Sequence, residues 1–260
     1  MSGGIAITTD ARGIARLTLD RPEKRNALDA ACCDALASAA RDLATDAAVR
    51  VVVLEGAGSV FCAGGDLDWM RAQAGADRTT RLREARRLAE MLRALNELPK
   101  PLIARIHGAA LGGGVGLVCV SDVAIASEDT AFGLTETRLG LIPATISPYV
   151  LARMGEAAAR AVMLSGRRFD AAEAVRFGLV TRAVPMGALD AAVEAEVEAN
   201  LLAAPGAQEA AKRLARSLGA PIDAARIADT VERLADVWES DEAQAGIAAF
   251  LERREMPWTP

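Results

Sequence analysis

The segment at residues 49–54 is almost uninterrupted in apolar residues and ends at Gly56. This pattern is typical of a β-strand that is covered on both faces, as in a parallel sheet between layers of helices. Other segments show the periodicity of strands or helices. Strands are expected at residues 13–19, 102–106, 123–126, 131–133 and 179–184. Helices are expected at residues 30–44, 79–98 and 112–120, and another helical segment is expected after the glycine loop that ends at Asp66. Strands that alternate with helices predict an α/β fold with mostly parallel pairing.

From residue 189 onward the sequence predicts only helices, interrupted at Pro205 and near Pro221. Several of these segments have an apolar face, which must be buried in the same chain or against a neighbouring subunit. We therefore expect an α/β core at residues 1–188 and a helical region at residues 189–260.

Composition excludes several classes of function. The 260-residue chain has one histidine, His107, and four cysteines without CxxC spacing, so no metal site is expected. Its net charge of −5 argues against a dedicated nucleic-acid-binding protein. We expect reduced thiols and a cytoplasmic location, because no signal peptide is apparent. The longest uncharged apolar stretch, residues 108–120, is shorter than the about 18 residues that a membrane span needs.

Two glycine-rich segments could present backbone N–H groups to a ligand. Residues 62–66 read CAGGD, and residues 111–116 read LGGGVG before a predicted helix. Glycine permits sharp turns and close approach, and two separate amide donors are what an oxyanion hole requires. A phosphate cradle is an alternative, although neither spacing matches a nucleotide-binding motif. The second alternative is that the glycines only allow helices to pack closely. If a single glycine cluster is considered alone, this structural role is favoured over ligand binding.

Glu136 is the third candidate for chemistry. It lies among the apolar and small residues of the segment 132–143. A desolvated carboxylate has a raised pKa and can act as a general acid or base. The alternatives are an ion pair with Arg138 or simple exposure to solvent, and spacing alone does not decide among them.

Five segments resemble, in order, those of the crotonase (enoyl-CoA hydratase/isomerase) superfamily. They are RPEKRNALD (21–29), FCAGGDL (61–67), LGGGVGL (111–117), FGLTETRLGLIP (132–143) and AFLERREMPW (249–258). The resemblance implies a spiral of ββα units with a helical trimerisation region at residues 189–260. It also implies a homotrimer or homohexamer, an acyl-CoA thioester as substrate, and no cofactor beyond the coenzyme A of that substrate.

The resemblance assigns roles to individual residues. Gly65 and Gly113 would supply the two N–H groups that hold the thioester oxygen, and Glu136 would be the catalytic carboxylate. Arg253 or Arg254 would reach a phosphate of coenzyme A. The alternative is a solvated surface charge for each of four residues: Lys24, Arg25, Arg253 and Arg254. The predicted residues that bind substrate or coenzyme A are Lys24, Arg25, Ala27, Ala63, Asp66, Leu67 and Asp68.

One position departs from the family pattern. Simple hydratases of the family carry a second glutamate where this chain has Gly116. A single carboxylate suits a Δ3,Δ2-enoyl-CoA isomerase, which moves one proton between C2 and C4. Segments 66–70, 114–117 and 141–149 nevertheless resemble the bacterial 3-methylglutaconyl-CoA and isohexenylglutaconyl-CoA hydratases of leucine and acyclic terpene breakdown.

We therefore expect a hydro-lyase that hydrates a branched glutaconyl-CoA through an enolate held in an oxyanion hole. Arg138, Tyr149 or Ser147 is expected to pair with the distal carboxylate of that substrate; alternatively, this carboxylate itself helps to position the water. The isomerase is one alternative. A catalytically silent protein that binds CoA thioesters or RNA is another, because six arginines crowd the predicted helix at residues 79–98 and its approach. A solvated helix face is the favoured explanation of these arginines, so nucleic acid is not expected as a partner.

Overall fold

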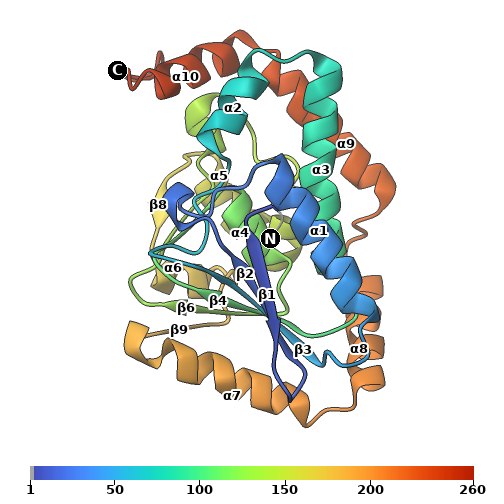
Figure 1. Cartoon of the computed structure of the whole chain (residues 1–260). Helices are drawn as coiled ribbons and strands as arrows, with labels where there is room; N and C mark the ends of the chain where they lie inside the picture. The colour runs from blue at the N-terminus through green and yellow to red at the C-terminus, as the bar shows by residue number, and fades with distance from the viewer. Residues whose placement is uncertain (1–2) are drawn as a thin grey trace.

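The computed structural model describes residues 3–260 and confirms the predicted α/β architecture (Figure 1). A six-stranded sheet has the order β1-β2-β3-β4-β6-β9, and a three-stranded sheet has the order β5-β7-β8. In the larger sheet only the β1–β2 pair is antiparallel. The strands are β1 (Ile5–Thr9), β2 (Ile14–Leu19), β3 (Val51–Gly56), β4 (Leu102–Ile106), β5 (Ala109–Leu111), β6 (Val123–Ser127), β7 (Ala131–Gly133), β8 (Arg168–Phe169) and β9 (Arg182–Val184).

The helices follow the predicted segments closely, although α5 and α6 were not expected. The α-helices are α1 (Ala30–Thr45), α2 (Leu67–Ala74), α3 (Arg78–Glu97), α4 (Gly113–Cys119), α5 (Ser147–Met163), α6 (Ala171–Arg176), α7 (Leu189–Leu201), α8 (Pro205–Leu218), α9 (Ala224–Trp238) and α10 (Asp241–Leu251). Short 3-10 helices are η1 (Pro22–Lys24), η2 (Glu136–Leu139) and η3 (Met186–Ala188). The predicted break at Pro205 is wrong by a few residues, because Pro205 is the first residue of α8, where proline is tolerated.

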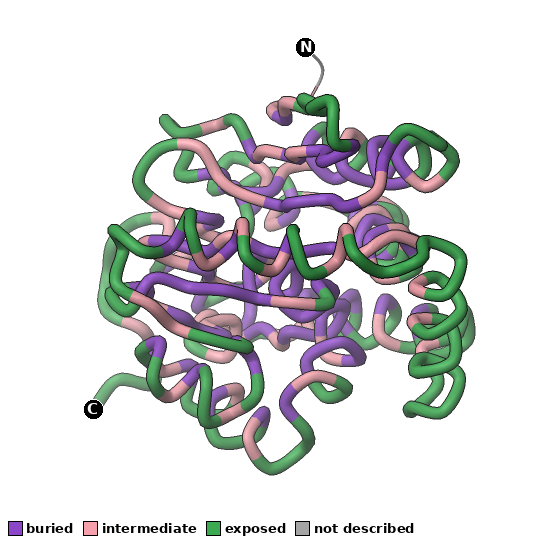
Figure 2. Tube along the Cα trace, turned by 90° about the horizontal axis from the view of Figure 1, so that it is seen from below, coloured by how far each residue is buried: buried purple, intermediate pink, exposed green. Residues whose placement is uncertain are grey.

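Both faces of β3 are buried, as its apolar run predicts. Val51 and Val53 pack with the apolar face of α7, whereas Val52 and Leu54 belong to the larger core that includes α1. Figure 2 shows the central strands as buried and the outer turns of the helices as exposed. The sheet is therefore a rigid platform for the loops that leave it.

The helices after residue 188 are buried to different extents. Residues of α9 and α10, among them Val231 and Trp238, pack against Ala85 and Ala89 of α3. Helix α8, by contrast, contains no buried residue and exposes Leu218. The domain boundary at residue 188 and the oligomeric assembly stay predictions. Throughout residues 3–260, every helix is too short or too polar to cross a membrane.

Hydrogen bonds between loops bring three distant segments together. The Cys62 N–H donates to the Ala109 carbonyl (3.0 Å), and the Leu111 N–H donates to the Cys62 carbonyl (3.0 Å). The Gly112 N–H then donates to the Gly133 carbonyl (2.8 Å). The loop after β3, the start of α4 and the segment that leads to η2 are thus held side by side.

Candidate active site

A cavity of about 210 Å³ lies where these three segments meet, and its wall includes Gly65, Gly113 and Glu136. The three residues predicted to be catalytic are therefore brought together from the loop after β3, the first turn of α4 and η2. Most of the remaining wall is apolar and comes from the first turn of α1, from α2, α3 and α9, and from the residues near η2. Such a site can exclude water from a bound group and strengthen electrostatic interactions within it.

Two backbone N–H groups in the wall are available to a ligand. Within residues 3–260, neither the Gly65 N–H nor the Gly113 N–H donates a hydrogen bond to a protein acceptor. Gly113 is the first residue of α4, and N–H groups in the first turn of a helix have no partner inside the helix. Two fixed donors at one cavity can stabilise negative charge on an oxygen atom.

The close approach of the two glycine-rich loops depends on residues without a side chain. Gly64 has a φ of +95°, and a Cβ atom there would lie 3.0 Å from the Leu111 carbonyl oxygen. Gly112 has a φ of +49°, and its Cβ would lie 3.0 Å from Glu136 Oε1. A Cβ at Gly114 would lie 2.7 Å from the Cys62 carbonyl oxygen, so close packing, the alternative role, applies at that position.

The carboxyl group of Glu136 is desolvated. Its Oε2 atom is buried and has no hydrogen-bond partner in the described chain. Burial raises the pKa of Glu136 to about 7. The alternative ion pair with Arg138 is not formed, because Arg138 Nε donates to the Ser165 carbonyl (3.2 Å). A carboxyl group with a pKa near neutrality can both accept and return a proton.

Ile146 occupies the space that a side chain at Gly116 would enter. A Cβ atom at Gly116 would be 2.7 Å from Ile146 Cγ2 and 3.4 Å from Leu92 Cδ2. Overpacking of this kind disfavours any larger residue at position 116. The other carboxylates that line the cavity are Asp29 and Glu84.

The predicted contacts with coenzyme A divide into two groups. Ala63 and Leu67 line the cavity. Lys24 and Arg25 are exposed, and Lys24 Nζ forms an ion pair with Asp68 (2.7 Å). Contacts of these five residues with substrate stay predictions.

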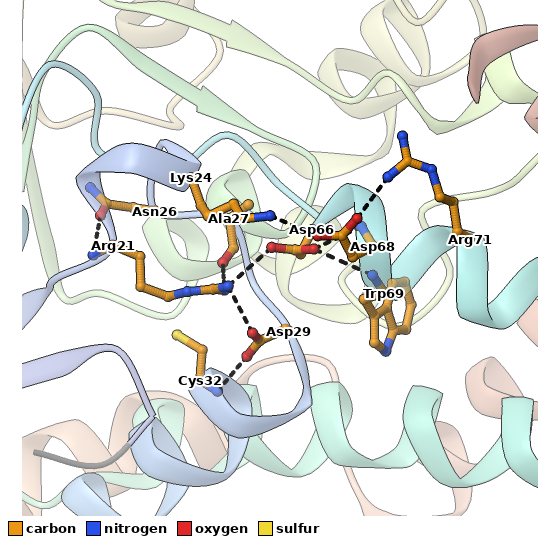
Figure 3. Close-up of polar contacts among 10 residues, drawn as sticks. All are labelled: Arg21, Lys24, Asn26, Ala27, Asp29, Cys32, Asp66, Asp68, Trp69 and Arg71. Atoms are coloured by element: carbon orange, nitrogen blue, oxygen red, sulfur yellow. Dashed lines mark hydrogen bonds and ion pairs between the residues drawn. The ribbon is translucent and has the colours of Figure 1, made fainter. Parts of the chain in front are cut away.

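Asp66 has a structural role in the loop (Figure 3). Its buried side chain caps α2 by accepting hydrogen bonds from the Asp68 N–H (2.8 Å) and the Trp69 N–H (3.3 Å). It also forms an ion pair with Arg21 (3.1 Å), which donates to the carbonyl of buried Ala27 (2.6 Å). Asp66 thus fixes the loop that carries Gly65. Direct contacts of Asp66 and Ala27 with substrate stay predictions.

Asp66→Ala is expected to lower the free energy of unfolding by about 2–3 kcal/mol, because α2 loses its cap and Arg21 loses a partner. Urea denaturation measures this change. Asp66→Asn keeps an oxygen that can cap the helix and is expected to lose about 1 kcal/mol. Equal stability of Asp66→Ala and the wild type would show that the capping and ion-pair network is not stabilising.

The three residues predicted to pair with a distal substrate carboxylate, Arg138, Ser147 and Tyr149, lie outside the cavity wall. Ser147 Oγ donates to the Pro143 carbonyl (2.6 Å), and Tyr149 is buried in the main core. Proximity to Glu136 in sequence is misleading here, because Gly140, in the left-handed conformation, ends η2 and redirects the chain.

The cavity wall also contains polar residues that the sequence did not predict as site residues, among them Trp69, Glu84 and Arg87. Glu84 and Arg87 are three residues apart on α3, next to Leu88, which also lines the cavity. This spacing places them on one face of the helix. Their position beside an apolar stripe is the one signal in the sequence that points to them.

The other arginines of α3 are mostly engaged within the chain. Arg78 pairs with three acidic residues of α9 and its C-terminus, and Arg93 pairs with Glu97 (3.2 Å). Arg81 is buried and donates to the carbonyl groups of Gln73 and Ala74. These contacts fit an ion-paired helix face, the favoured explanation, rather than a basic surface for RNA.

The four cysteines are free and buried. Burial raises the pKa of Cys62 to about 12, so this thiol stays protonated near neutral pH and is a poor nucleophile. No three His, Cys, Asp or Glu side chains of residues 3–260 are grouped as metal ligands. Glu136 is therefore the group in the cavity that is best suited to proton transfer.

Comparisons with known proteins agree over nearly the whole chain. Residues 9–260 match the family model described as enoyl-CoA hydratase/isomerase. A probable enoyl-CoA hydratase of Bacillus subtilis is 35% identical over 250 residues, which cover 93% of each chain. The crystal structure of an enoyl-CoA hydratase from Shewanella pealeana is 38% identical, with a TM-score of 0.81 and coverage of 98% of this chain and 96% of that one. One from Mycobacterium avium is 36% identical, with a TM-score of 0.86 and full coverage of both chains.

Proposed function

Because the chain belongs to the enoyl-CoA hydratase/isomerase family and has the crotonase fold, we propose that it adds water to a 2-enoyl-CoA thioester. Removal of water from the 3-hydroxyacyl-CoA is the same reaction in reverse. One observation carries this proposal: a single cavity contains two free backbone N–H groups and a carboxyl group with a pKa of about 7.

The thioester oxygen accepts hydrogen bonds from the Gly65 N–H and the Gly113 N–H. This contact draws electrons from the double bond, so that C3 becomes electrophilic. Ionised Glu136 takes a proton from water while the water oxygen bonds to C3, and the electron pair of the double bond forms an enolate. The two N–H groups stabilise the enolate oxygen.

Glu136 then returns its proton to C2, and the thioester carbonyl forms again. One molecule of water has been added, and the carboxylate is regenerated. A single carboxyl group can perform both proton transfers. The absence of a glutamate at position 116 is therefore compatible with hydration.

An isomerase is the second candidate. The observation that favours it is Ile146, which occupies the space beside Gly116 and leaves no second carboxylate on α4. Glu136 would then remove a proton from C2 of a 3-enoyl-CoA and return it at C4. The same two N–H groups would hold the intermediate enolate.

The finer proposal is a branched glutaconyl-CoA as substrate, as in leucine or acyclic terpene breakdown. The segments at residues 66–70, 114–117 and 141–149 support it by their resemblance to that branch of the family. We also propose a cytoplasmic homotrimer or homohexamer that needs no separate cofactor. Exposed Leu214 and Leu218 of α8 support assembly, because exposed apolar patches often mark contacts between proteins.

Mass spectrometry of CoA thioesters, with chromatographic separation of double-bond isomers, tests the function. The substrates are 3-methylglutaconyl-CoA, crotonyl-CoA and a 3-enoyl-CoA. Gain of one water by a 2-enoyl-CoA supports a hydratase, and gain by the first substrate alone supports the glutaconyl branch. Migration of the double bond without water identifies an isomerase. No turnover of any substrate would contradict both enzymatic proposals and favour a protein that only binds thioesters.

The rate of hydration is expected to rise with pH. Glu136 must be ionised to accept a proton from water, and its pKa is about 7. At pH 6, kcat/KM is therefore expected to be about tenfold below its plateau at high pH. A pH–rate profile between pH 5.5 and 8.5 measures the midpoint. A flat profile over this range would show that Glu136 is not the titrating base.

A further inference from the structure

Several polar residues of the cavity wall have no role in the proposed hydration, and three of them lie in contact with one another. We name Trp69, Glu84 and Arg87 the distal cluster. Trp69 Nε1 donates a hydrogen bond to Glu84 Oε2 (3.3 Å), and Arg87 Nε lies 3.6 Å from the same oxygen. The Glu84 side chain is only 9% exposed, so these contacts are largely shielded from solvent.

The indole ring of Trp69 connects the distal cluster to the oxyanion loop. The benzene edge of the ring lies 3.8 Å from the Cβ position of Gly65, and the Nε1 edge contacts Glu84. The distal cluster is thus about one indole ring away from Gly65, the residue whose N–H group would hold the thioester oxygen. A second carboxylate on a five-carbon acyl chain is separated from the thioester carbon by a similarly short chain.

Arg87 is the cation of the distal cluster that can receive a ligand. Its Nε atom is buried and has no hydrogen-bond partner within the described chain. A buried donor without an acceptor costs free energy, which an incoming oxygen would recover. Its Nη1 atom pairs with Asp34, which is 59% exposed, so this ion pair is screened by solvent and contributes little.

The chemistry of a guanidinium group selects the ligand. Its planar edge matches the two oxygens of a carboxylate and can form paired hydrogen bonds with them. Arg83 Nε also lies 3.4 Å from Glu84 Oε1, so two arginines flank the Glu84 carboxylate. Arg83 and Arg87 stand beside the carboxylates of Glu84 and Asp34, so the contact with an additional anion depends on the paired donors of Arg87 and not on an excess of positive charge.

We propose that Arg87 determines specificity by binding a second carboxylate at the end of the acyl chain, while Glu84 and Trp69 position its side chain. The preferred substrates are then CoA thioesters of 2-enoic dicarboxylic acids. The proposal rests on the proposed hydration, because it concerns the acyl group in the same cavity. It assigns to α3 the contact that the sequence predicted for Arg138, Ser147 or Tyr149.

Glutaconyl-CoA and crotonyl-CoA provide a matched test, because they differ only in the carboxylate on C4. The wild type is expected to hydrate glutaconyl-CoA with the higher kcat/KM. Arg87→Met is expected to lower kcat/KM for glutaconyl-CoA about 100-fold, mainly through KM, and to change that for crotonyl-CoA less than about threefold. Arg87→Lys keeps the charge without the paired donors and is expected to recover part of the loss.

Arg86→Met is the matched control. Arg86 is the neighbouring residue on the same helix, is exposed, and does not line the cavity. Arg86→Met removes the same charge outside the cavity, so both substrates are expected to react with this variant as they do with the wild type. Equal losses on both substrates in Arg87→Met, or no preference of the wild type for glutaconyl-CoA, would overturn the assignment of Arg87.

Binding measurements separate this proposal from the proposed function. Glutaryl-CoA and butyryl-CoA are saturated analogues that cannot be hydrated, and calorimetry compares their affinities for the wild type and Arg87→Met. A preference for glutaryl-CoA that is lost in Arg87→Met supports the carboxylate site even if no substrate is hydrated. Hydration of crotonyl-CoA without any such preference would leave the function intact and reject the site.

Discussion

Glu136→Gln is expected to lower kcat for hydration at least about 1,000-fold while binding of the CoA thioester is retained. Glutamine has nearly the same shape as glutamate but cannot accept a proton from water. General acid–base catalysis contributes about 10²–10⁴-fold, and here one group performs both proton transfers. Loss of the enoyl-thioester absorbance measures the rate, and calorimetry with butyryl-CoA measures binding.

The stability of the same variant provides its control. Burial raises the pKa of Glu136 from its ordinary value of 4.5 to about 7, so the folded state binds the proton more tightly than the unfolded state does. The stability of the wild type therefore decreases as the pH rises from 4.5 to about 7. Glu136→Gln lacks this loss and is expected to be about 1–3 kcal/mol more stable than the wild type at pH 8.

At pH 4.5 the difference is expected to be small, because the carboxyl group is then mostly protonated in the folded state. Thermal denaturation at the two pH values compares the proteins. If Glu136→Gln is inactive and also unfolded at pH 8, its inactivity does not support a catalytic role, and the predicted gain in stability is contradicted. A folded variant with more than about a tenth of the wild-type activity would exclude Glu136 as the essential base.

Gly64→Ala is expected to reduce kcat about 100-fold or more by separating the two N–H donors. Gly64 has a φ of +95°, which alanine rarely adopts, and its Cβ would lie 3.0 Å from the Leu111 carbonyl oxygen. The loops that carry Gly65 and Gly113 must then move apart. Loss of one donor from an oxyanion hole typically costs 10²–10³-fold in kcat.

The carbonyl stretching frequency of a bound enoyl thioester reports the two hydrogen bonds directly. Binding to the wild type is expected to lower this frequency, and the shift is expected to be smaller in Gly64→Ala. Gly75→Ala is a control for the substitution itself, because Gly75 has a φ of −94° and nothing lies within 4 Å of its Cβ position. An unchanged frequency shift together with full activity in Gly64→Ala would argue against the oxyanion hole.

Local patterns were sufficient to predict most elements of the core. The apolar residues at 49–54 and on one side of α1 and α3 are the ones that face the core. Their spacing repeats with the period of a strand or a helix, so it can be recognised in the sequence. Helix α5 was missed although it has 17 residues, and short strands were missed as well. Strand β5 has only three residues, and strand β8 has two, so pairing with other strands decides their conformation.

The residues of the candidate site could likewise be predicted only in part from the sequence. The sequence by itself determined that two glycine-rich turns and one carboxylate in an apolar segment are present, because backbone conformation and local polarity constrain residue type. Only the tertiary structure decided that Gly65, Gly113 and Glu136 share a cavity, that burial raises the pKa of Glu136, and that Arg87 lies in the same wall. These properties arise from contacts between segments distant in sequence, which no local pattern encodes.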